Sequence, residues 1–486
     1  MQDTTQFADI DFDLSAAARA GGRSRWIALI VLCLGMLMIV LDVTIVNVAL
    51  PSIQTELKFS QSGLAWVVNA YLIAFGGLLL LAGRLGDLAG RRTIFLAGLA
   101  VFTAASAVCG LSVSQSMLIG ARFVQGIGGA MTSAVILGMI VTLFPAPREM
   151  ARAIGVYAFV ASAGGAVGLL AGGILTQAIN WHWIFFVNIP IGIATAAAAI
   201  RVIPRDQGTG LRGGADVPGA LLIIGAMMLG VYTIVKPAAS DGWLAPQTLT
   251  LGAVSLVLLA GFVVRQRTAR NPLMPLRILS SRGIAAANLI QVLSVAGMFG
   301  MFFLGSLFLR EVLGYDPLRI GLAFLPVAIG MAVLSVRYTD RIAARFGARG
   351  TMIAGLTLIV AALVLFSQAP EHAGYLAHVF PVALLMGLGA GLAFPALMTV
   401  AMSGVDPAEA GLASGLVNTT AQVGGALGLA VLDTVSAGRT SALAAHGASQ
   451  LSALTGGYHL AFWIAAGLAG AAIVVAATLL RPQHLS

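Results

Sequence analysis

The stretch that decides the fold is the first long apolar segment, where residues 26–51 read WIALIVLCLGMLMIVLDVTIVNVALP. A helix that spans the hydrocarbon core of a bilayer needs about 20 apolar residues, so this segment is long enough to cross a membrane. Asp42 lies well inside it. A carboxylate near the bilayer centre costs roughly 2.5–3.5 kcal/mol on insertion scales, and such a residue normally marks a functional site. The alternative is a structural Asp42 that pairs with a helix terminus or with Arg122.

The composition of the whole chain is that of a polytopic membrane protein. Of its 486 residues, 59% are hydrophobic and 9% are charged, whereas soluble domains carry about 25% charged residues. The net charge of +9 is explained by basic loops at one membrane face, so no nucleic-acid partner is expected. Cys33 and Cys109 both lie in apolar segments, which argues against a disulfide framework.

Fourteen apolar segments are candidates for transmembrane helices. They cover approximately residues 26–50, 62–82, 93–112, 116–144, 150–177, 182–203, 217–236, 247–264, 283–309, 318–336, 351–369, 376–403, 408–436 and 458–480. Helices are expected because a lipid-exposed backbone must satisfy its own hydrogen bonds, and a closed barrel would need alternating segments of about ten residues. The predicted fold class is therefore an all-α polytopic membrane protein with 14 transmembrane helices.

The basic residues predict the orientation, since cytoplasmic loops carry an excess of Lys and Arg. With the N-terminus in the cytoplasm, 21 of the 27 basic residues fall in inside segments and five in outside connections. Arg122, within a span, is the remaining one. The Ala- and Gly-rich, Arg-over-Lys composition points to a GC-rich bacterial genome. We therefore expect a multi-pass protein of the bacterial inner (plasma) membrane with both termini in the cytoplasm.

The chain also repeats itself at an offset of about 260 residues. The matched residues are Gly155, Gly164, Gly165, Ala166, Gly168 and Leu169 with Gly415, Gly424, Gly425, Ala426, Gly428 and Leu429. Residues 125–128 align with 386–389, and the loop of Asp87 and Arg91 has a weaker counterpart around Asp340 and Arg345. Chance alignment of Gly- and Ala-rich spans is the alternative. Two parallel halves favour a rocking transporter with its site at the midplane.

The repeat predicts a division of the chain into five parts. They are a cytoplasmic tail (1–25), a six-helix bundle (26–203), an inserted transmembrane hairpin with its flanking loops (204–282), a second six-helix bundle (283–480) and a second cytoplasmic tail (481–486).

Four motifs carry a family resemblance. They are LDVTIVNVALP at 41–51, GRLGDLAGRR at 83–92, RFVQGIGGA at 122–130, and the glycines Gly155, Gly164, Gly168, Gly172 and Gly173. With them the chain resembles, over essentially its whole length, the fourteen-helix drug:proton antiporter family of the major facilitator superfamily. The resemblance implies export of small amphipathic, cationic drugs or toxic compounds by alternating access, driven by the proton motive force without a cofactor. We expect a chain that is functional as a monomer.

The resemblance implies that Asp42 binds a proton, a cationic substrate or both in turn, and that Arg122 takes part in proton coupling. Desolvation raises the pKa of a carboxyl and a nearby cation lowers it, so an Asp that alternates between dry and wet surroundings can carry a proton. An Arg is not deprotonated in a protein, so Arg122 would act by its fixed charge. The aligned residue of the second copy is Ala383. The alternative is an Arg122 that snorkels to the outer interface.

The loop at 83–92 is expected to act as a gate latch. Its candidate residues are Gly83, Arg84, Asp87, Gly90, Arg91 and Arg92. Asp87 can accept hydrogen bonds from a helix N-terminus or pair with an Arg of the other half. The alternative is a basic loop that only sets topology.

The glycines of the fifth segment recur at spacings that allow close helix packing. The family pattern often has Pro after the third glycine, where this chain has Leu169, so a kink there is in doubt.

Asp433 is a candidate second acidic site for protons or cations, unless it is wetted and inert near the outer end. Further cavity candidates, or else interhelical hydrogen bonds, are Asn47, Asn69, Tyr71, Gln125, Asn188, Asn288, Gln291, Asn418 and Gln422.

Two rival functions stay open at this point: a dedicated exporter of one endogenous metabolite or antibiotic, and a non-transporting membrane sensor or scaffold. The sequence has no Gly-x-x-x-x-Gly-Lys-Ser/Thr loop, which argues against ATP as the energy source. It also has no His/Cys cluster with the spacing of a metal site. An enzyme is the function least favoured.

Overall fold

The computed structural model describes residues 22–480 except 207, 209, 211–213, 236–241, 275, 278–280 and 404–409. The predicted tail 481–486 and most of the predicted tail 1–25 lie outside the described residues. The described elements are all helical: α2 (Gly22–Leu57), α3 (Gln61–Ala89), α4 (Arg91–Gly110), α5 (Gln115–Leu143), α6 (Pro147–Ala178), α7 (Trp183–Phe186), α8 (Asn188–Val202), α9 (Val217–Val235), α11 (Pro246–Thr268), α12 (Arg282–Leu307), η3 (Phe308–Val312), α13 (Pro317–Arg337), α14 (Thr339–Phe366), η4 (Tyr375–Val379), α15 (Phe380–Met402), α16 (Ala410–Ala445) and α17 (Gln450–Leu479).

Thirteen helices among the described residues are long and apolar enough to cross a membrane. The predicted fifth span, 150–177, falls in α6, a helix of 32 residues whose stretch Gly164–Ala178 forms a shorter apolar segment. An all-helical, multi-pass membrane protein is thereby confirmed.

Several elements differ from the predicted spans at their ends. Helix α2 begins at Gly22 and continues through Pro51 to Leu57, because a proline costs a helix one hydrogen bond without always ending it. The stretch around Asp340 is helical, not a loop, and Gly347 kinks α14 there with a φ of +75°. The predicted sixth span is divided into α7 and α8 at Val187.

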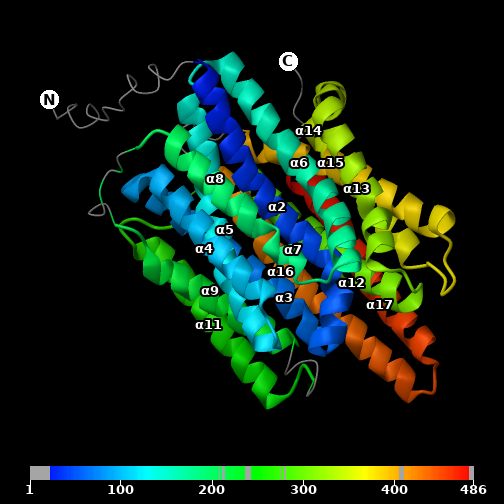
Figure 1. The fold of residues 1–486 in the computed structure, drawn as a ribbon. Helices are drawn as coiled ribbons and strands as arrows, with labels where there is room; N and C mark the ends of the chain where they lie inside the picture. Colours follow the sequence, from blue (N-terminus) through cyan, green and yellow to red (C-terminus); the bar gives the residue numbers. More distant parts are fainter. Residues whose placement is uncertain are drawn as a thin grey trace.

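Figure 1 shows two groups of helices side by side, the blue-to-cyan helices on one side and the yellow-to-red helices on the other. In the first group α2 packs on α6 and α8, and α5 packs on α3 and α4. In the second group α12 packs on α16 and α17, and α15 packs on α13 and α14. The two groups meet mainly where α6 contacts α13 and where α3 contacts α16.

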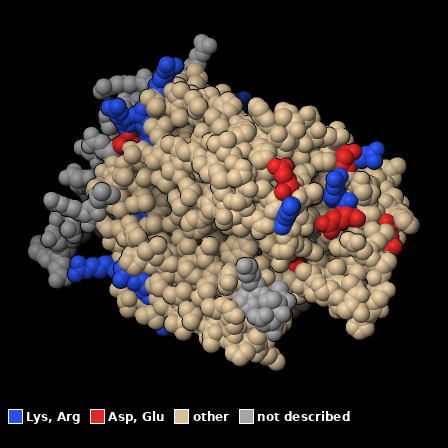
Figure 2. All heavy atoms as spheres, turned by 60° about the horizontal axis from the view of Figure 1, so that its bottom comes forward, with Lys and Arg blue, Asp and Glu red and all other residues tan. Residues whose placement is uncertain are grey.

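Helices α9 and α11 form a hairpin at the edge of the molecule (Figure 1). Because α9 packs on both α3 and α16, it bridges the two groups. The Thr434 hydroxyl of α16 donates to the Ile234 carbonyl of α9 at 3.3 Å. Helix α11 exposes large apolar side chains such as Leu256 (67%) and Val257 (68%). Figure 2 shows a broad uncharged area between two edges where charged groups gather, as expected for a surface that faces lipid.

Candidate functional site

Asp42 and Arg122 form an ion pair in the interior of the first group of helices. The Arg122 Nη1 atom of α5 lies 2.6 Å from Oδ2 of Asp42 in α2. Asp42 is 0% exposed and Arg122 is 1% exposed. Arg122 therefore does not snorkel to the outer interface. The structure brings the two predicted residues together, whereas their role in transport stays a prediction.

Two amide side chains complete the surroundings of the Asp42 carboxylate. Its Oδ1 atom accepts hydrogen bonds from Nε2 of Gln125 at 2.7 Å and from Nδ2 of Asn188 at 3.2 Å. Gln125 Nε2 also donates to the Ser106 hydroxyl at 2.7 Å, and Gln125 Oε1 accepts from Arg122 at 2.6 Å. The four residues around the carboxylate are all buried: Arg122, Gln125, Asn188 and Ser106. The carboxylate is therefore held by a network with little access to water.

The charge of Arg122 is compensated on several sides. Its Nε donates to the Val67 carbonyl at 3.0 Å. The guanidinium carbon lies 4.4 Å from the centre of the Tyr71 ring and 5.8 Å from that of Phe185. Cation–π contacts of this kind add to the ion pair when the site is desolvated. Removing one partner of a buried pair costs about 3–5 kcal/mol, because it leaves an uncompensated charge.

Local sequence explains this geometry. Arg122 and Gln125 are three residues apart, so they share one face of α5. A Cβ at Gly126 would lie 2.5 Å from the Tyr71 carbonyl, and one at Gly128 would overlap the backbone of Phe102. The glycines that follow Gln125 therefore let α3 and α4 approach α5 closely enough to close the network.

Two members of the network, both in α4, were not predicted as site residues. Ser106 and Cys109 lie on one face of α4, and the Cys109 thiol lies 3.7 Å from Gln125 Oε1. Asn188 opens α8. The available signal was the three-residue spacing of Ser106 and Cys109 in an apolar span, which is too common to single out without the partner helix.

The other amide candidates divide into bonded and unpaired groups. Asn47 donates to the Val43 carbonyl of its own helix at 2.9 Å, and Asn288 accepts from Thr420 at 2.8 Å, which is an interhelical bond. By contrast, both amide atoms of Asn69 are buried without a hydrogen-bond partner among the described residues, as is Oε1 of Gln291.

The remaining polar candidates lie around these groups. The Tyr71 hydroxyl is also buried without a partner in the described chain. Gln422 packs against α3, where a Cβ at Gly76 would meet its Cβ at 2.7 Å. Asn418 is exposed. The structure therefore brings Tyr71 and Gln125 to the ion pair, whereas Asn47 and Asn288 bond elsewhere and Gln422 packs against α3.

Asp433 lies in the second group of helices, away from the Asp42 network. It is 0% exposed, so it is not wetted. Neither carboxylate oxygen has a hydrogen-bond partner among the described residues. Gln61 approaches the carboxyl, but its Nε2 donates to Ser436 at 3.4 Å. Glu311 is close enough for its charge to act on Asp433 and accepts from the Tyr458 hydroxyl at 2.6 Å.

The predicted loop at 83–92 is helical except at Gly90, since α3 runs to Ala89 and α4 begins at Arg91. Arg91 Nη2 lies 3.0 Å from Oδ1 of Asp87, and Arg91 Nη1 donates to the Gly138 carbonyl of α5 at 3.0 Å. Arg84 donates weakly to the Gly214 carbonyl at 3.5 Å. Pairing of Asp87 with the other half stays a prediction.

Asp206, which the sequence did not single out, caps the helix that follows this loop. Its carboxylate accepts from the backbone N–H groups of Arg91 and Arg92, the latter at 3.1 Å. Gly90 has a φ of +96°, and a Cβ there would lie 2.9 Å from the Asp206 carbonyl. Gly83 lies against α5 with room for a side-chain carbon. The glycine at position 90 therefore lets the backbone of Asp206 approach the start of α4.

The fifth-segment glycines face two different helices. A Cβ at Gly172 would lie 2.8 Å from the Ile45 carbonyl of α2, and Gly164 and Gly168 also face α2. Gly173 instead faces α13, where a Cβ would lie 2.9 Å from the Pro317 carbonyl. Gly155 faces open space.

These features together define a multi-pass membrane protein of the transporter class. Residues 32–429 match the family model of the Major Facilitator Superfamily. The chain belongs to that superfamily, and its curated relatives are of the drug-efflux type.

Two of those relatives are named for antibiotic resistance or export. The puromycin resistance protein pur8 of Streptomyces alboniger is 38% identical over 460 residues, which cover 93% of this chain and 91% of that protein. The cephamycin export protein CmcT of Amycolatopsis lactamdurans is 38% identical over 426 residues, 87% of each chain. A solved bacterial homologue of the human lysosomal transporter Spinster, inward-facing and unoccupied, shares the fold, with a TM-score of 0.67 at 16% identity over 95% of this chain and 100% of that chain.

Proposed function

We propose that the protein exports small amphipathic compounds, cationic ones included, in exchange for protons. The observation that carries this proposal is the buried ion pair of Asp42 and Arg122. Relatives named for antibiotic resistance and export support the substrate class. A dedicated exporter of one antibiotic is the second candidate, favoured by the relative named for cephamycin export.

Asp42 is proposed to carry the proton. As a carboxylate it accepts from Arg122, Gln125 and Asn188. Protonation would weaken those bonds and leave the charge of Arg122 less compensated, so the protonated and ionised sites favour different arrangements of the surrounding helices. A cationic substrate near Asp42 would disfavour the proton, and the antagonism must be reciprocal. The membrane potential supplies about 2.3 kcal/mol per charge per 100 mV.

The proposed movement is a rocking of two six-helix halves. The packing of α2 on α6 is repeated by α12 on α16, and that of α4 on α5 by α14 on α15, which supports the predicted repeat. In this proposal α6, which holds the predicted fifth span, also crosses the membrane and brings the number of spans to fourteen. The hairpin α9–α11 is the insertion, and both termini are cytoplasmic. The chain then works as a monomer without a cofactor.

The unpaired polar atoms are proposed to meet the substrate or water. Asn69 in α3 and Gln291 in α12 belong to different halves and bury polar atoms without a partner in the described chain. A buried polar group left unsatisfied costs about 1–3 kcal/mol. A bound compound with hydrogen-bonding groups would recover part of this cost.

Asp433 is proposed as a second acidic site.

The proposal is tested with inverted membrane vesicles that contain the protein. A pH gradient is imposed across the vesicle membrane to drive uptake. Uptake of a fluorescent lipophilic cation should depend on the gradient and stop when an ionophore collapses it. Uptake of a single antibiotic, with no response to other compounds, would favour the dedicated exporter. Absence of flux for every compound would contradict transport and favour a sensor or scaffold.

A further inference from the structure

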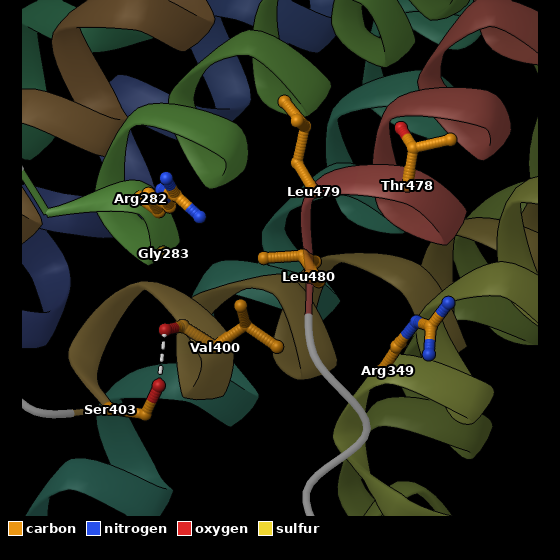
Figure 3. A pocket seen from close by; sticks show the side chains of 8 residues that line it. All are labelled: Arg282, Gly283, Arg349, Val400, Ser403, Thr478, Leu479 and Leu480. Carbon is orange, nitrogen blue, oxygen red and sulfur yellow. Dashed lines mark hydrogen bonds between the residues drawn. The ribbon is translucent and has the colours of Figure 1, made fainter.

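A pocket opens where four helices of the second group end (Figure 3). Its volume is about 590 Å³. The lining includes Arg282 in the first turn of α12, Arg349 of α14, Val400 of α15, and Thr478 and Leu480 at the end of α17. None of these residues belongs to the Asp42 network, so the pocket has no part in the proposed coupling.

The charge of the pocket is positive. Arg282 and Arg349 line it from opposite sides (Figure 3), and its lining among the described residues contains no Asp or Glu. Arg349 Nε donates to the Ala476 carbonyl at 3.2 Å, and its Nη2 donates to that of Ala477. These bonds fix the guanidinium at the C-terminal end of α17, where the helix dipole favours a cation.

Arg282 lies in less favourable surroundings. It occupies the first turn of α12, the end of a helix where the dipole disfavours a cation. It is exposed and makes no hydrogen bond or ion pair within the described part of the chain. A bound anion would compensate this charge and the helix end together.

The hydroxyl groups of Ser403 and Thr478 already donate to backbone carbonyls, so they are not donors for an anion. Ser403 donates to the Val400 carbonyl at 2.7 Å, and Thr478 donates to the Val474 carbonyl at 2.7 Å. An anion in the pocket would therefore receive its hydrogen bonds from the arginines, whose planar donors suit phosphate oxygens.

The position of the pocket relative to the membrane indicates the source of that anion. The candidate span Arg282–Val312 begins here, and Tyr375–Met402 and Gln450–Leu479 end here, so the pocket lies where hydrocarbon gives way to headgroups. Leu479 and Leu480 add apolar wall. We propose that this pocket binds the phosphate of an anionic phospholipid headgroup between Arg282 and Arg349, as basic pockets between transmembrane helices can do.

The test uses the purified full-length protein in neutral detergent. Phosphatidylglycerol is expected to raise the melting temperature more than phosphatidylcholine. Arg282→Gln should weaken the apparent affinity for phosphatidylglycerol about fivefold, the factor that corresponds to about 1 kcal/mol per basic residue near a membrane surface. Arg345→Gln is the matched control, because Arg345 belongs to the same helix as Arg349 but its guanidinium lies 5.6 Å from the Phe346 ring centre and outside the pocket lining.

Arg349→Gln also removes two bonds to α17, so a lower melting temperature without lipid is expected for that variant alone. Arg282→Gln keeps the experiment decisive because it removes no described bond. An equal response to both lipids, or an unchanged affinity in Arg282→Gln, contradicts the proposal. A third arm adds inorganic phosphate in place of lipid. The same stabilisation by phosphate alone would identify a soluble oxyanion and overturn the lipid assignment.

Discussion

Asp42 and Arg122 are 80 positions apart in the chain, yet their charged groups meet at 2.6 Å in a buried site. The pair joins α2 to α5, and its partners come from α3, α4 and α8. The carboxylate of Asp42 therefore contacts side chains of α5 and α8 directly, and the network reaches α3 through Arg122 and α4 through Gln125.

The first prediction concerns the stability of this pair. Arg122→Gln should lower the melting temperature of the purified protein strongly, since breaking a buried pair costs about 3–5 kcal/mol. The double variant Asp42→Asn, Arg122→Gln should be more stable than Arg122→Gln alone, because it leaves neither charge uncompensated. Additive losses in the double variant would show that the two groups do not compensate each other.

The second prediction concerns the glycines of α6. Gly168→Ala should destabilise the protein by about 1–3 kcal/mol, the usual cost of overpacking, because the added Cβ would overlap Thr44. Gly155→Ala is the matched control, since nothing lies within 4 Å of its Cβ position. Thermal unfolding compares the two. Equal stabilities would mean that α2 and α6 are not in close contact.

The third prediction concerns Asp433. Asp433→Asn should fold with the stability of the wild type, because the carboxyl has no hydrogen-bond partner among the described residues and the substitution removes no bond. Asp42→Asn, which weakens a bonded carboxylate, should be clearly less stable. Melting temperatures measured side by side check this difference. A large loss in Asp433→Asn would reveal a partner for this carboxyl.

The fourth prediction concerns the end of the hairpin where α9 begins and α11 ends. Burial acts to raise the pKa of Asp216, but hydrogen bonds from Arg265, Gln266 and the Gly219 N–H outweigh it and hold the pKa below its usual range. The stabilisation is therefore present above the unfolded pKa of about 3.9 and lost as the pH falls through the folded pKa.

The wild type should keep a constant stability advantage over Asp216→Asn above about pH 5, and that advantage should shrink below about pH 4. Hydrogen exchange of α9 and α11 at a series of pH values measures it locally. A gap that grows as the pH falls would contradict the account.

Much of the fold could be predicted from the sequence, because long apolar segments determine helices in a membrane. The ends were harder to predict, since α2 passes Pro51 and α14 begins at Thr339, where tertiary packing overrides local signals. Asp42 and Arg122 could be singled out because a charge within a span is costly. Ser106, which joins the network through Gln125, could not, because small polar residues are common in spans. Asp206 was missed because its role depends on contact between two loops.

Proton release from energised inverted vesicles is the decisive measurement of whether Asp42 couples protons to export. A panel of lipophilic cations and neutral antibiotics is added to vesicles with the wild type and with Asp42→Asn. We expect the wild type to release protons when a substrate is added, and Asp42→Asn to lose that release at equal protein content. Unchanged release in Asp42→Asn would contradict the assignment and move the proton site elsewhere, with Asp433 as the next candidate.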